Sequence, residues 1–142
     1  MPDQVDSFRI GLVLHHPSCD PAAISSALGL HPTGALRAGY QTSRGTRKTT
    51  MWMCNFRVGL GNDAFGLALE EMLTFLELHR SYLQGFRSEG GEIEVTLSQT
   101  IVWDDGVVFE MRLEPFFLLA IVKAEATLRV TAWSADPSEP DL

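Results

Sequence analysis

The chain has 142 residues, of which 45% are hydrophobic and 20% are charged, and its formal net charge at neutral pH is −7. This length and composition are typical of one soluble globular domain with a sizeable core, and they exclude a disordered chain. The acidic balance argues against general nucleic-acid binding, which depends on basic residues that neutralise phosphates.

The sequence also argues against membrane insertion and secretion. No apolar run reaches the ~18–20 residues that a membrane-spanning helix needs, and the start, MPDQVDSFR, lacks the basic and apolar regions of a secretory signal. The only cysteines, Cys19 and Cys54, are far apart and give no disulfide framework. We therefore expect a cytoplasmic protein with reduced thiols.

Hydrophobic alternation predicts strands over residues 7–15, 49–58 and 92–102. The third has the clearest period of two, and the polar side chains between its apolar residues favour an antiparallel sheet with one solvated face. The second places one set of side chains on a shared face: Thr50, Trp52, Cys54, Phe56 and Val58.

Two helices are predicted between these strands. Asp20 and Pro21 provide an N-cap and a proline at the first helical position, and Gly29 suits the C-terminal end of that short helix. A longer helix is predicted over residues 63–86, where leucine, phenylalanine and methionine recur at helical spacing. This long helix is expected to cover the sheet.

The C-terminal third should add a hairpin, a helix and a last strand. Asp105 and Gly106 form a tight-turn signal, so residues 107–111 are predicted to return as a strand. Pro115 then suits the start of a helix, and residues 126–133 form a strand.

The expected fold is therefore a two-layer α+β sandwich over residues 1–133. Its sheet is mostly antiparallel with about five strands, and three helices cover it, in the order β-α-β-α-β-β-α-β. Residues 134–142 are expected to be a disordered acidic tail.

The charge distribution is the main functional signal. No acidic residue lies between Asp20 and Asp63, whereas five basic residues do; the rest of the chain has six basic and eighteen acidic residues, a net charge of −12. Within this segment, residues 33–48 lack a hydrophobic period, which predicts a long irregular loop. The candidate anion-binding residues on or beside this loop are Arg37, Tyr40, Arg44, Arg47, Lys48 and Trp52.

Arginine suits such a role because its planar guanidinium donates two parallel hydrogen bonds to a carboxylate or phosphate. We therefore predict a non-enzymatic binding domain that captures a small anion or an acidic protein. The alternative for the same arginines is substrate binding in a small enzyme, with His31 as the nearest acid or base. They could also be ordinary solvated charges, or Arg37 could pair with a carboxylate of the body.

Other sites have little support. His15, His16, Cys19 and His31 include ligand types that suit zinc, but their spacing matches no zinc motif, so no metal site is predicted. No nucleophile motif occurs, and the pair Gly59 and Gly61 lacks the third glycine of a dinucleotide fingerprint. No catalytic residue and no cofactor are predicted.

The predicted C-terminal helix carries four consecutive apolar residues, Phe116 to Leu119. They cannot all face one core across a helix. Some of them must meet another layer or another chain, so a homodimer through residues 116–122 is the alternative to complete burial in the core.

Several short motifs together resemble a known family. They are Asp20-Pro21, Leu28-Gly29-Leu30, Pro32-Thr33, Arg37 with Gly39, and Trp52 on the following strand. On these motifs, residues 7–133 resemble the bacterial domain-of-unknown-function family 4279. The resemblance implies a small α+β domain of unassigned activity. It also suggests, by analogy, a further alternative: an immunity-type protein that covers a toxin with its acidic surface.

Overall fold

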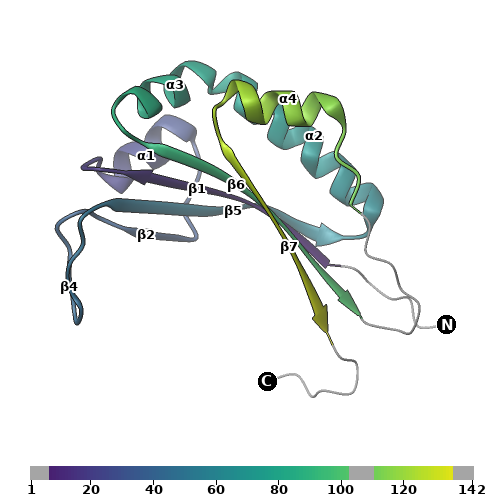
Figure 1. Cartoon of the computed structure of the whole chain (residues 1–142), viewed down its shortest axis with the longest axis horizontal. Helices are drawn as coiled ribbons and strands as arrows, with labels where there is room; N and C mark the ends of the chain where they lie inside the picture. Colours follow the sequence, from purple (N-terminus) through teal and green to yellow (C-terminus); the bar gives the residue numbers. More distant parts are fainter. Residues whose placement is uncertain (1–6, 103–110, 136–142) are drawn as a thin grey trace.

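The computed structural model describes residues 7–102 and 111–135. Its main sheet has five strands in the order β2-β5-β1-β6-β7 (Figure 1). The central strand β1 (Ser7–His16) pairs antiparallel with β5 (Thr50–Leu60) and with β6 (Glu92–Val102). One edge is β2 (Gly34–Leu36), antiparallel to β5, and the other is β7 (Thr127–Ala135), parallel to β6.

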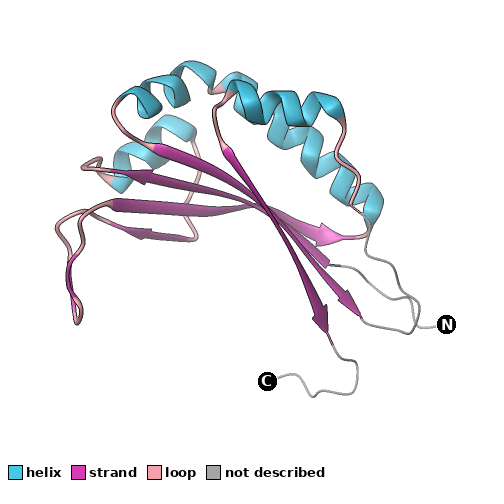
Figure 2. Ribbon diagram, viewed as in Figure 1, coloured by secondary structure: helices cyan, strands magenta, loops and turns pink. Residues whose placement is uncertain are grey.

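The described helices all lie on one face of this sheet (Figure 2). They are α1 (Pro21–Leu28), α2 (Asn62–Leu78), α3 (Arg80–Ser88) and α4 (Pro115–Lys123). The predicted α+β class and mainly antiparallel sheet are thus confirmed. None of the helices in the ranges that the structure describes has the length and apolar character to cross a membrane.

The number of helices was predicted incorrectly, because the long helix expected over residues 63–86 is broken. His79 leaves helical geometry, with φ −100° and ψ 18°, and it ends α2 and precedes α3. Its backbone N–H still donates to the carbonyl of Phe75 at 3.0 Å, and its ring lies 4.5 Å from the Phe75 ring. The break changes the helix direction without loss of the hydrophobic period, which is why the sequence pattern did not reveal it.

The identity of the fifth strand also differs from the prediction. It is β2, which lies within the segment 33–48 that we expected to be irregular. Three residues are too few to show alternation. The predicted return strand over 107–111 falls almost entirely outside the described residues, and its one described residue, Met111, is in no strand.

Strand β1 lies at the centre of the core. Ile10, Leu12 and Leu14 have no exposed surface, and they face the helix layer as the alternation predicted. The start and end of α1 also follow the prediction. Asp20 Oδ1 accepts a hydrogen bond from the Ala22 N–H at 3.0 Å, and Gly29 adopts a left-handed φ of 67°.

A β-bulge in β5 explains another difference. Val58 was predicted to share a strand face with Trp52 and Phe56, which are both buried, but 63% of its surface is exposed. The register shifts here, since Ile10 pairs with Arg57 whereas Gly11 pairs with Asn55, so β5 contains one extra residue. As a result Phe56 and Arg57 both meet α2: Phe56 packs on Phe75, and Arg57 forms an ion pair with Glu71.

Trp52 occupies the core between the sheet and α1. Its side chain has no exposed surface, and its indole Nε1–H donates to the Ser25 hydroxyl oxygen at 3.0 Å. This hydrogen bond satisfies the single polar group of a large buried side chain. Trp52 therefore holds α1 on β5.

Helix α4 divides its apolar side chains between two directions. Phe117, Ala120 and Ile121 are buried. Phe116 and Val122 are 77% and 69% exposed, and Leu118 and Leu119 are partly exposed. The expectation that the four consecutive apolar residues cannot share one core is thus met, and the outer face of α4 remains uncovered within the described part of the chain.

The Trp52 contact predicts a difference between two neighbouring serines. Ser25→Ala should lower the free energy of unfolding by about 1–3 kcal/mol, because it leaves the buried indole N–H without an acceptor. Ser26→Ala is the matched control, since Ser26 is exposed on the same helix. Urea unfolding of both variants measures the difference, and equal stabilities would contradict this role of Ser25.

We propose the exposed outer face of α4 as the contact surface of the homodimer that the sequence offered as an alternative. If two copies meet there, Leu119→Glu with Val122→Glu should convert a dimer to a monomer in sedimentation velocity, because each copy would bury like charges. Leu67→Glu with Leu78→Glu is the control, as both leucines are exposed on α2. A wild-type protein that sediments as a monomer at high concentration would exclude this interface.

Candidate functional site

The segment from Arg37 to Lys48 forms a two-stranded projection that we call the basic hairpin. Its strands are β3 (Gln41–Thr42) and β4 (Gly45–Thr46), which pair antiparallel. The pairing continues one step toward the body, since the Arg47 N–H donates to the Tyr40 carbonyl at 2.9 Å. Figure 1 shows the hairpin extending from the end of the sheet, away from the helix layer.

The tip of the basic hairpin is closed by local hydrogen bonds. The Thr42 hydroxyl donates to the Gly45 carbonyl at 2.9 Å and accepts from the Arg44 N–H at 3.2 Å. Gly45 has a φ of 119°, which only glycine adopts easily. This geometry places Arg44 at the outermost turn.

The base of the basic hairpin is fixed to the body through Thr50. This threonine is completely buried, although it is polar. Its hydroxyl oxygen accepts from the Ala38 N–H at 3.0 Å and donates to the Cys19 carbonyl at 2.6 Å. One side chain thereby joins the hairpin, β5 and the turn that precedes α1, so the hairpin leaves the body in a defined place.

The cations of the basic hairpin face solvent. Arg37, Arg44 and Lys48 are exposed, and Arg47 is half-buried with its Nε–H donated to the Thr49 carbonyl at 3.3 Å. Within residues 7–102 and 111–135, no carboxylate lies within 4.0 Å of these four side chains. Arg57 differs, because its ion pair with Glu71 on the body partly neutralises its charge.

The structure divides the six candidate residues into two groups. Five belong to the basic hairpin, including Tyr40, which is 59% exposed. Trp52 is separated from them because it lies in the core with its N–H already bonded, so its surface cannot meet a ligand. The sequence pattern placed Trp52 on the same strand face as Cys54 and Phe56, and the structure buries this face, which excludes a surface role for Trp52.

An apolar surface lies beside the basic hairpin, and the sequence interpretation missed it. Met51 and Met53 alternate with the buried Trp52 and Cys54, so they face the side of the sheet that no described helix covers. Leu36 pairs with Met51 across β2 and β5 and shares this face. All three are half-buried. The alternation over residues 49–58 already places Met51 and Met53 on one face, but the prediction considered only the opposite face, which carries Trp52.

The two thiols are poorly suited to nucleophilic chemistry. Burial raises the pKa of Cys19, and the negative charges of Glu89 and Asp20 raise it further. Burial likewise raises the pKa of Cys54, although Arg57 opposes this in part. A raised pKa reduces the thiolate fraction at neutral pH. Cys54 in addition donates its S–H to the carbonyl of His31 at 3.3 Å.

His16 has a structural position. It is 6% exposed, and its Nδ1 accepts hydrogen bonds from the backbone N–H groups of Ser18 and Cys19 at 3.1 and 2.8 Å. The ring proton must then be on Nε2, which lies 3.0 Å from Glu89 Oε2. Nδ1 is thus engaged by backbone N–H groups. In the described ranges no three histidine, cysteine or acidic side chains are arranged to hold a metal ion.

This geometry predicts that His16 stabilises the fold mainly through the hydrogen bonds that its Nδ1 accepts. His16→Phe should retain the ring contact with Phe86 but leave two N–H groups unpaired, so the free energy of unfolding should fall by about 1–3 kcal/mol. Glu89→Gln, at an exposed partner, should cost less than about 1 kcal/mol. Chemical denaturation compares the free energies of unfolding of the two variants. An equal loss in both would assign the effect to the ion pair between His16 and Glu89 instead.

Comparison with known proteins gives one match. A family model described as a domain of unknown function, DUF4279, matches residues 6–135. No curated protein and no solved structure matches the chain. The matched range includes the whole of the sheet, the four helices and the basic hairpin.

Proposed function

The chain belongs to the DUF4279 family, and we propose that it is a binding module whose basic hairpin docks on an acidic surface of a partner protein. The observation that carries this proposal is the separation of charge. Arg37, Arg44, Arg47 and Lys48 are gathered on one projection, and no described carboxylate pairs with them.

The charge of the body supports a specific orientation for this encounter. Residues outside the segment between Asp20 and Asp63 carry a net charge of −12, so an acidic partner is repelled by most of the molecule. It is attracted only toward the hairpin, which favours approach from that side and lowers the number of unproductive encounters.

A protein partner fits this site better than a free anion does. The apolar side chains of Leu36, Met51 and Met53 lie at the base of the hairpin on the uncovered sheet face. Methionine adapts its shape to a partner surface, and apolar contact combined with a charged rim is typical of protein interfaces. A small anion would use the arginines and leave this apolar surface without a role.

A charge-reversal experiment tests the proposal. The variant R44E/R47E/K48E should bind a fluorescent polyglutamate peptide at least about tenfold more weakly than wild type, since three exposed ion pairs contribute roughly 0.5–1 kcal/mol each. Fluorescence anisotropy at low and moderate salt measures this loss. Wild-type affinity should fall as salt rises.

The matched control has the same net charge as the hairpin variant. R9E/R80E/K123E changes three exposed cations elsewhere on the described surface, and it should bind the peptide within about twofold of wild type. Equal losses of peptide affinity in both variants would mean that only the total charge matters. A hairpin variant that binds the peptide as tightly as wild type would mean that the hairpin does not bind it. Either result contradicts the proposal.

A further inference from the structure

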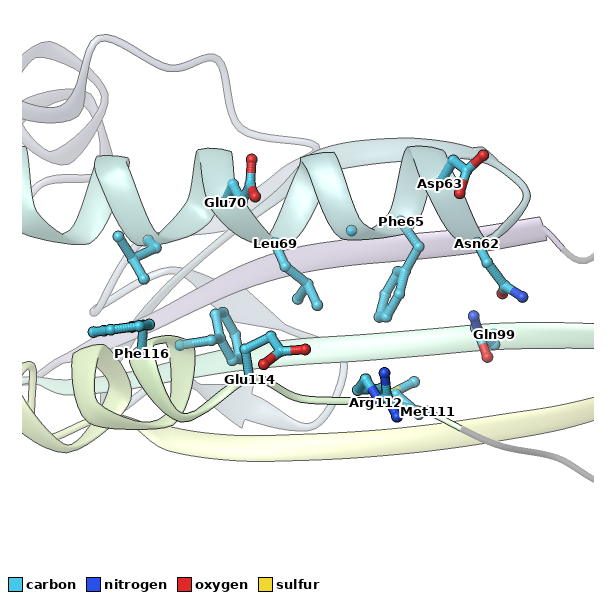
Figure 3. Close-up of a pocket in the computed structure, with 13 residues that line it drawn as sticks. Asn62, Asp63, Phe65, Leu69, Glu70, Gln99, Met111, Arg112, Glu114 and Phe116 are labelled. Atoms are coloured by element: carbon cyan, nitrogen blue, oxygen red, sulfur yellow. The ribbon is translucent and has the colours of Figure 1, made fainter.

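A cavity of about 690 Å³ lies at the opposite end of the molecule from the part of the sheet that carries the basic hairpin. It is enclosed by the N-terminal half of α2, by β6, by residues 111–114 and by the start of α4 (Figure 3). Its volume falls in the range of small-molecule sites, about 300–1,000 Å³.

One part of the cavity wall is apolar. Phe65, Leu69 and Leu73 come from α2, and Phe116 and Phe117 come from α4. Leu69 and Phe65 point from α2 toward the cavity, and Phe116 borders it from α4 (Figure 3). Phe116 is 77% exposed, whereas Phe65, Leu69 and Phe117 are at most 6% exposed, so Phe116 provides most of the solvent-exposed apolar surface of this wall. An apolar chain placed there would remove that surface from water.

The other part of the wall carries hydrogen-bonding groups. Gln99 of β6 lines the cavity and is only 5% exposed. In Figure 3 it lies at the same end of the cavity as Asn62, the first residue of α2. The Gln99 amide can donate a hydrogen bond to a ligand atom or a water molecule in the cavity.

The charged groups that line the cavity are of both signs, namely Arg112 and the carboxylates of Asp63, Glu70 and Glu114. The N-cap of α2 is Gly61, which has no side chain to bond the free N–H groups of the first turn. Arg112 borders the same end, and its guanidinium has no carboxylate within 4.0 Å among the described residues. Asp63 and Glu70 of α2 also line the cavity, and Figure 3 shows their carboxylates directed away from it.

We propose that this cavity binds a small amphipathic carboxylate. Its carboxylate would accept hydrogen bonds from Arg112 and the Gln99 amide, and its apolar chain would lie against Leu69 and the phenylalanines of α4. Glu114 also borders the cavity and is directed toward Arg112 in Figure 3, so it competes with the ligand for that guanidinium. This site is independent of the basic hairpin.

Gly66 provides a way to fill the cavity without disturbing the fold. It lines the cavity from α2, and a Cβ added there meets no atom within 4 Å. Gly66→Leu also improves the helix propensity of α2. Gly85→Leu is the matched control, because Gly85 is a helical glycine of α3 with equally open space and it does not line the cavity.

The test uses hexanoate and octanoate as probes, with amide chemical shifts of the full-length protein as the readout. Octanoate should perturb the signals of α2 saturably and bind roughly fifteenfold more tightly than hexanoate, because each buried methylene contributes about fourfold in affinity. Gly66→Leu should weaken octanoate at least about tenfold, whereas Gly85→Leu should not change it. Glu114→Gln should bind octanoate more tightly.

The head group is tested with a neutral analogue of the same length. Arg112→Met should weaken octanoate by about tenfold and leave octan-1-ol unchanged, since only the carboxylate uses the guanidinium. The proposal is overturned if octanoate does not saturate by about 10 mM, a limit already weak for a ligand of this size. It is also overturned if Gly66→Leu binds octanoate like wild type, or if Arg112→Met weakens acid and alcohol equally.

Discussion

The contact between the central strand and the helix layer determines the rest of the structure. Ile10, Leu12 and Leu14 of β1 are completely buried, and both edges of β1 are paired. A side chain buried under helices on a strand that is hydrogen-bonded on both sides cannot move without loss of several contacts at once. The described helices therefore stay on one face, and the other face of the sheet remains available for recognition.

In this one-sided arrangement, different structural elements hold the two candidate sites in place. The basic hairpin is attached through the buried hydroxyl of Thr50 near the end of β1. The cavity is lined by residues of α2, β6 and α4 and by residues of the segment 111–114. Because different elements form them, an anionic protein surface and an amphipathic small molecule could be bound independently, and a substitution at one site should leave the other intact.

The parts of the fold that the sequence predicted are those with a repeated or local signal. Alternation over several residues identified β1, β5 and β6, and the Asp20-Pro21 pair with Gly29 identified the ends of α1. The parts that were missed have no such signal. Strand β2 has only three residues, too few to show alternation. The bulge between Asn55 and Arg57 is visible only in how β5 pairs with β1. The break at His79 leaves the spacing of the apolar residues unchanged. For the candidate site, the charge pattern located the basic hairpin. The burial of Trp52 and the partial exposure of Met51 depend instead on which face of β5 the helices cover.

The central position of β1 also has a consequence during protein synthesis. Leu12 pairs with Cys54 on one side and with Val95 on the other, so one edge of β1 can be paired well before its second partner has been translated. At translation rates of about 5–20 residues per second, roughly two to eight seconds separate the two partners. During that interval an apolar strand has an open edge on the ribosome, where it can pair with another nascent chain. The order of the strands along the chain thus leaves one edge of β1 unpaired until β6 has been translated.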